Sequence, residues 1–150
     1  MAHETLIELV SRYSPSGQEE NAVDWLTGRM QALGYSRAFK DGAGNAVGIM
    51  GEGPRQLVLL GHIDTVPGEI PLKINDDILF GRGAVDAKGP LACFTDAVAQ
   101  VGSIEGWQFV VIGAVDEERN SCGARFAATQ YRPDYAIIGE PNHWNRFALG

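Results

Sequence analysis

Cysteine and histidine are scarce in this chain. Its 150 residues include two cysteines, Cys93 and Cys122, and three histidines. Two cysteines are too few for the disulfide framework that stabilises small secreted domains. Because both lie in apolar segments with a helical pattern, we expect two reduced, buried thiols. A disulfide or a metal-binding pair is the alternative.

Basic residues and long apolar runs are also limited. Twelve Lys and Arg stand against nineteen Asp and Glu, which gives a net charge of −7. A nucleic-acid surface needs clustered Lys and Arg, so we expect none here. No apolar stretch approaches the roughly 20 residues that span a membrane. The opening MAHETLIELV contains two glutamates and lacks the basic segment of a signal peptide, so we expect a cytoplasmic protein.

The chain has the composition of one globular domain, with 45% apolar and 21% charged residues and no internal repeat. A helical period predicts helices over residues 5–13, from Ser16 to Gly34, over 87–101 and over 122–130. Ser16 and Glu19 match the capping box of the second helix. Apolar runs predict strands over residues 37–40, 46–50, 56–60, 107–115, 135–138 and from 147 to 149, with a hairpin over 72–83 that turns at 75–77.

Alternation of helices and strands predicts an α/β fold, a three-layer sandwich with a mostly parallel central sheet. The strands over 56–60, 107–115 and 135–138 are expected to be its buried members. In such sheets, functional residues lie beyond the carboxyl ends of the strands. The segments to inspect are therefore GHIDTVP after Leu60, DEERN after Val115 and GEP after Ile138.

The first of these segments contains His62 and Asp64. In a continued strand, residues two apart point to the same side. Asp64 can then accept a hydrogen bond from the His62 ring and leave the other ring nitrogen for a metal. A purely structural hydrogen bond is the alternative.

Asp86 lies in GRGAVDAKG, between a glycine-rich turn and a predicted helix. It is either a metal ligand or the N-cap of that helix. The segment lacks the Gly-x4-Gly-Lys-Ser/Thr spacing of a phosphate-binding loop.

The other two segments contain glutamates. Glu117 and Glu118 are adjacent and diverge along an extended chain, so one can bind metal while the other faces a substrate. Glu140 is a ligand or a simple turn carboxylate. One histidine with several carboxylates suits Zn²⁺, Co²⁺ or Mn²⁺, and a carboxylate can bridge two ions.

Four motifs, LLGHIDTVPG, GRGAVDAKGP, AVDEERNSCGA and GEPN, occur in this order. Together they resemble the zinc-dependent aminoacylase/carboxypeptidase family, which includes acetylornithine deacetylase, succinyl-diaminopimelate desuccinylase and glutamate carboxypeptidases. The resemblance covers essentially the whole chain. It is most similar to the lysine-biosynthesis branch, whose members release lysine or ornithine from an amino-group carrier protein.

The resemblance implies two metal ions, zinc or cobalt, and a role for each residue of the site. His62 and Glu140 would bind one ion, Glu118 the other, and Asp86 would bridge them; Glu117 would be the general acid/base, and Asp64 would orient His62. The Asp86–Ala87 peptide is expected to be cis.

The implied function is metal-dependent hydrolysis of an amide in an N-acyl amino acid or a carrier-protein conjugate, by a homodimer. Residues 1–150 would form the N-terminal part of the catalytic domain, without the lid and dimerisation domain or the C-terminal part. A histidine ligand of the second ion is then missing, and His143 is expected to be a surface residue rather than its substitute. The 150 residues alone are therefore expected to be inactive. The alternatives are an inert metal-binding fragment and a related dinuclear aminopeptidase.

Overall fold

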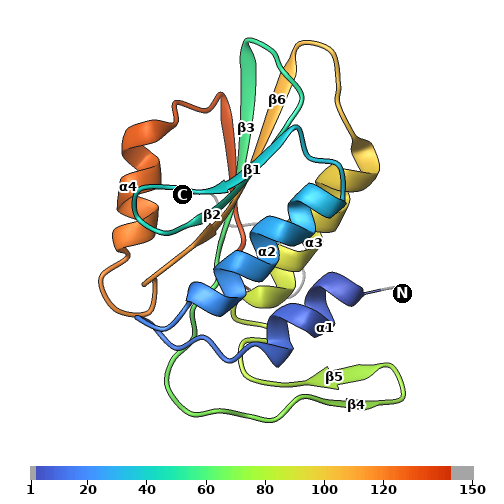
Figure 1. The fold of residues 1–150 in the computed structure, drawn as a ribbon, viewed down its shortest axis with the longest axis vertical. Helices are drawn as coiled ribbons and strands as arrows, with labels where there is room; N and C mark the ends of the chain where they lie inside the picture. The colour runs from blue at the N-terminus through green and yellow to red at the C-terminus, as the bar shows by residue number, and fades with distance from the viewer. Residues whose placement is uncertain (1–2, 143–150) are drawn as a thin grey trace.

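The computed structural model describes residues 3–142 of the chain (Figure 1). Its helices are α1 (Glu4–Ser11), α2 (Glu20–Ala32), α3 (Lys88–Val101) and α4 (Cys122–Gln130). Its strands are β1 (Arg37–Lys40), β2 (Ala46–Met50), β3 (Arg55–His62), β4 (Lys73–Asn75), β5 (Ile78–Phe80), β6 (Trp107–Ala114) and β7 (Tyr135–Ile138). The strand predicted to begin at residue 147 lies outside the described residues.

Five strands form one sheet in the order β1-β2-β6-β3-β7. The pairs β6–β3 and β3–β7 are parallel, whereas β1–β2 and β2–β6 are antiparallel. Figure 1 shows α1, α2 and α3 on one side of this sheet and α4 on the other. The predicted α/β sandwich is confirmed, with a mixed sheet whose three site-bearing strands are the parallel ones.

Side chains of β3 and β6 enter two apolar cores because successive residues of a strand face opposite sides of the sheet. Leu59 and Val111 pack in the core beneath α1, α2 and α3. Val58 and Val110 pack with Ala127 in the core beneath α4. The two strands that lead to the candidate site are thus fixed on both faces.

Three local predictions are wrong. Ser16 and Glu19 do not form a capping box: α2 begins at Glu20, its N-cap residue Glu19 makes no side-chain capping bond, and the Ser16 hydroxyl donates to Asp64 instead. The strand β7 is exposed along its whole length, because it is the last strand of the sheet within residues 3–142. Cys93 and Cys122 are free, but both lie on exposed positions of their helices.

One further feature agrees with expectation. The predicted hairpin is present as β4 and β5, with Asp76 in the left-handed conformation at its turn. Within residues 3–142, no helix is long and apolar enough to cross a lipid bilayer.

Candidate metal centre

The ends of the three parallel strands bring the candidate residues together. His62 is the last residue of β3 and pairs in register with Ala114, the last residue of β6. Glu117 and Glu118 follow β6, and Glu140 follows β7. The parallel register aligns these ends at one edge of the sheet, so residues far apart in sequence converge there.

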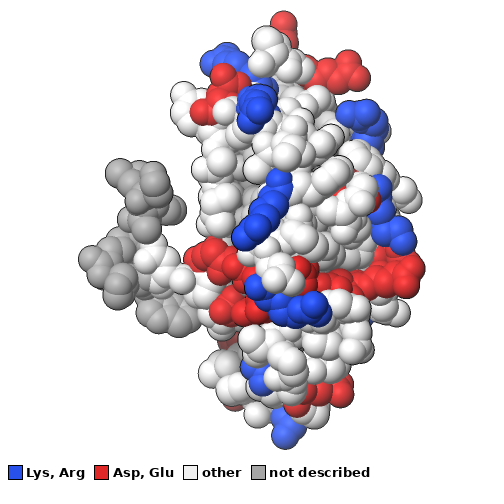
Figure 2. Space-filling model, turned by 90° about the vertical axis from the view of Figure 1, so that its left-hand side faces the viewer, with Lys and Arg blue, Asp and Glu red and all other residues white. Residues whose placement is uncertain are grey.

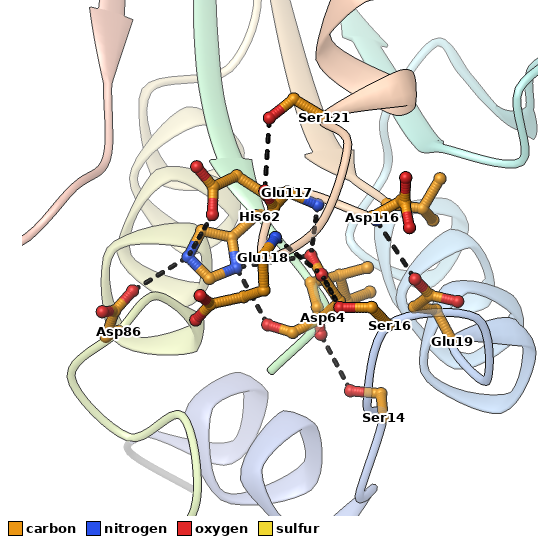
Figure 3. A network of polar contacts seen from close by, with 12 residues as sticks. Ser14, Ser16, Glu19, His62, Asp64, Asp86, Asp116, Glu117, Glu118 and Ser121 are labelled. Carbon is orange, nitrogen blue, oxygen red and sulfur yellow. Dashed lines mark hydrogen bonds and ion pairs between the residues drawn. The ribbon is translucent and has the colours of Figure 1, made fainter. Parts of the chain in front are cut away.

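The two ring nitrogens of His62 have different surroundings (Figure 3). Its Nδ1 lies 2.8 Å from the Asp64 carbonyl oxygen and 3.5 Å from the Asp64 carboxylate. Its Nε2 lies 2.9 Å from Asp86 Oδ1, 3.7 Å from Glu140 Oε1 and 3.9 Å from Glu117 Oε2. Asp64 therefore contacts His62 mainly through its main chain, and Nε2 faces the carboxylates.

Two groups of side chains share His62. His62, Glu117 and Glu140 form one group, and His62, Asp86 and Glu118 form the other; within each group the ligand atoms lie within 4.8 Å of one another. All four predicted metal ligands are thus in one place, together with Glu117. The Asp86–Ala87 peptide is cis, as expected. His143 lies outside the described residues.

Asp64 is fully buried beneath the cluster. Its carboxylate accepts hydrogen bonds from Ser16 Oγ at 2.7 Å and from the amides of Glu117 and Glu118, both at 3.1 Å. Burial alone would raise the pKa of Asp64, but the His62 ring nitrogen 3.5 Å from its carboxylate and the hydrogen bonds from Ser16 and these amides outweigh burial and lower the pKa. Asp64 therefore stays a carboxylate that holds the ring and the glutamates in place.

The pKa shifts of the other groups reflect crowded negative charge. Burial lowers the pKa of His62, but hydrogen bonds with Asp64 and Asp86 and the charge of Glu140 outweigh it and raise the pKa to about 10. Burial and the neighbouring carboxylates raise the pKa of Glu118 and Glu140, although His62 opposes this. The carboxylates thus favour a positive charge among them.

The ring nitrogen of His62 and the carboxylate oxygens around it form a set of ligand atoms that fits a divalent cation. Figure 2 shows Asp and Glu side chains gathered across the middle of one face of the molecule. The amine of Lys88 is buried and donates to the carbonyl oxygens of Leu9 and Arg12 at 3.1 and 2.7 Å. One imidazole and several carboxylate oxygens are ligands of Zn²⁺, Co²⁺ and Mn²⁺, and a bound ion would offset the repulsion among the carboxylates.

A groove of about 650 Å³ opens beside this cluster, between α4 and the strands β3 and β7. Its walls are mainly apolar, with Leu60, Ala127 and Ile138 among them, and it reaches Glu117 and Glu140. A molecule in this groove would meet both carboxylates.

The sequence pattern did not identify Ser16 or Lys88 as neighbours of the site. The hydroxyl of Ser16 was assigned to a helix cap, and a lysine after a glycine-rich turn gives no sign of burial. Their partners Asp64 and Leu9 lie 48 and 79 residues away in sequence. No short-range spacing rule detects such pairs.

Comparison with known proteins agrees with this geometry. The chain is 45% identical over 153 aligned residues to the LysW-lysine hydrolase of Deinococcus radiodurans, an alignment that covers 99% of the chain and 42% of the relative. It is 44% identical over 146 residues to a putative LysW-lysine/LysW-ornithine hydrolase of Pyrococcus abyssi, covering 97% and 41%. The chain thus spans about two fifths of the length of these relatives.

The fold is shared with solved structures. An M20 family metallo-carboxypeptidase from Sulfolobus solfataricus superposes with a TM-score of 0.72 at 20% identity, covering 90% of this chain and 36% of that one. The model of the family described as Peptidase family M20/M25/M40 matches residues 58–150, the part that contains every candidate ligand. The resemblance seen in the four motifs is confirmed, and the chain belongs to peptidase family M20/M25/M40.

Proposed function

We propose that these residues form the metal centre of an amide hydrolase that releases lysine or ornithine from an N-acyl or carrier-protein conjugate. The observation that carries the proposal is the approach of three carboxylates to one nitrogen of His62. The names of the curated relatives, LysW-lysine hydrolase among them, support the substrate. Membership of a peptidase family supports amide hydrolysis.

In the proposed centre, His62, Asp86, Glu118 and Glu140 are the residues that would hold the divalent ions, zinc or cobalt. By the family resemblance, His62 and Glu140 would serve one ion, Glu118 the other, and Asp86 both. Bound ions of this kind supply an acidified water and polarise the amide carbonyl. Asp64 keeps Nδ1 of His62 occupied, so that Nε2 is directed at the centre.

Glu117 is the proposed general base and acid. Its Oε2 lies 3.9 Å from His62 Nε2, so it borders the ligands. As the attacking water forms its bond to the amide carbon, Glu117 accepts the proton of that water. It then gives the proton to the leaving amine as the C–N bond breaks. A carboxylate oxygen of Glu117 also lies within 4.8 Å of a carboxylate oxygen of Glu140, so Glu117 is close enough to serve as a metal ligand. Its assignment as the base rather than as a ligand rests on the family resemblance.

The proposal is tested by assaying the natural polypeptide that carries residues 1–150. We expect metal-dependent release of free lysine from an N-acyl-lysine or a lysine–carrier-protein conjugate, abolished by a chelator and restored by Zn²⁺ or Co²⁺. Preferential cleavage of peptides with a free N-terminus would favour an aminopeptidase instead. Metal binding without any hydrolysis would favour an inert metal-binding protein.

The finer assignments stay predictions. They are a homodimer, a cytoplasmic location, and the placement of residues 1–150 in the first part of a catalytic domain. Residues 1–150 alone are expected to bind metal without turnover, and a metal titration beside the same assay checks this.

A further inference from the structure

Four successive backbone amides follow β6, and side-chain oxygens accept all four of their hydrogen bonds. The Val115 amide donates to Asn45 Oδ1 at 3.0 Å, and the Asp116 amide donates to Glu19 Oε1 at 3.1 Å. The amides of Glu117 and Glu118 donate to the two oxygens of Asp64. We call Glu19, Asn45 and Asp64 the amide brace; Figure 3 shows Glu19 near Asp116 and Asp64 below Glu117 and Glu118.

The members of the amide brace are buried. Asn45 and Asp64 are 0% exposed and Glu19 is 7% exposed. A buried polar group is costly unless it is hydrogen-bonded, so each acceptor needs the amide that it meets. Asn45 is also fixed through its Nδ2, which donates to Asp41 Oδ2 at 2.8 Å and to the carbonyl of Gly123 at 3.0 Å.

The brace acts where the chain turns out of the sheet. Asp116 adopts a positive φ of 62°, which non-glycine residues seldom adopt. Its carbonyl accepts the amides of Asn120 and Ser121 at 3.1 and 2.6 Å and thereby closes the turn that carries the two glutamates. Glu19 accepts the hydrogen bond of the Asp116 amide and so fixes the other end of the same residue.

We infer that Glu19 and Asn45 are positioning residues of the metal centre. By accepting hydrogen bonds from the amides of Val115 and Asp116, Asn45 and Glu19 fix the backbone at the start of the turn. Asp64 fixes the backbone of the next two residues in the same way. The carboxylates of Glu117 and Glu118 thereby keep their places beside His62. This inference rests on the proposed function, because it assigns the brace to a site that binds metal.

The test compares Co²⁺ binding by the wild-type chain and three variants. Glu19→Ala removes the acceptor, Glu19→Gln retains a side-chain oxygen, and Glu20→Ala is the matched control at an exposed neighbour whose carboxylate lies 3.9 Å from Lys40. We expect Glu19→Ala to weaken Co²⁺ binding about tenfold or more and to shift the Co²⁺ absorption bands. Glu19→Gln and Glu20→Ala should match wild type in affinity and spectrum. Wild-type binding and spectrum in folded Glu19→Ala would overturn the inference.

A second measurement does not depend on metal or on the folding of a variant. In the metal-free wild type, the amides of residues 115–118 should exchange with solvent more slowly than random-coil amides, although they lie outside a helix or strand. Exchange of these amides at random-coil rates would show that the hydrogen bonds of the amide brace do not form, and would overturn the inference. If the wild type binds no Co²⁺ while these amides are protected, the proposed metal centre fails and the brace stands.

Discussion

At the scale of single residues, the site depends on which nitrogen of His62 faces the carboxylates. Because Nδ1 lies against the main chain of Asp64, only Nε2 is directed at Asp86, Glu117 and Glu140. His62, Glu118 and Glu140 were candidates because each stands at or just after a strand end, which the apolar runs predicted. Asp86 lies in the loop before α3 and was a candidate because of its glycine-rich turn. The proximity of the Asp64 carbonyl to the ring, and the hydrogen bonds from the amides of Glu117 and Glu118 to the Asp64 carboxylate, required the structure.

Glu117→Gln separates catalysis from metal binding. In the natural polypeptide that carries residues 1–150, the substitution preserves shape and removes the proton acceptor, so turnover of lysine conjugates should fall by about 10²–10⁴-fold while bound metal is retained. Steady-state kinetics and metal analysis of the same preparation check both outcomes. Glu118→Gln is the comparison, in which metal content should fall. Near-normal activity in Glu117→Gln would exclude Glu117 as the general base.

At the scale of secondary-structure elements, the apolar patterns were sufficient to predict the bounds of those elements whose packing is local. The bounds of β1, β2, β7 and α4 agree with those predicted from sequence. The start of α2 and the exposure of β7 were missed, because Glu19 bonds to an amide 97 residues away and an apolar strand does not reveal whether it lies at an edge. Long-range pairing of this kind leaves no periodic signal.

The junction between β6 and α4 should be sensitive to one added methyl group. A Cβ at Gly123 would overlap Asn45 Oδ1 and the backbone of Val115. Gly123→Ala should therefore destabilise the fold by about 1–3 kcal/mol, measured by urea unfolding.

The matched control is Gly28→Ala in α2, an exposed position where a Cβ meets nothing within 4 Å. Alanine favours a helix over glycine, so this change should stabilise the fold by about 0.5–1 kcal/mol. Equal effects of the two substitutions would contradict the tight contact at Gly123.

At the scale of the whole molecule, the fold places a crowded acidic site at the end of a sheet that lies between two apolar cores. The cores fix β3 and β6 on both faces, and the carboxylates repel one another at the ends of these strands. Composition predicted the globular class and sequence order predicted the sheet layers. The net charge of −7 did not predict where the acid gathers, because that depends on the register of three strands.

Metal binding should therefore stabilise the entire domain. A ligand present at 100 times its Kd adds about 2.7 kcal/mol to the free energy of unfolding. For a chain of this length, such a gain raises the Tm by roughly 5–10 °C. Differential scanning calorimetry with Zn²⁺ and with a chelator measures this difference. His62→Ala, which removes a ligand of one ion, should show a clearly smaller shift, and an equal shift in that variant would place the stabilising ion elsewhere.

The most direct test of the account is a Zn²⁺ equilibrium dialysis of the wild type, Asp86→Asn and Glu140→Gln. These residues reach the cluster from different segments, the loop before α3 and the end of β7. The wild type should retain zinc, and each substitution should weaken its binding by about tenfold or more, because each removes a ligand of one shared centre. Undiminished zinc binding in both variants, or no binding by the wild type, would contradict a metal centre at the strand ends.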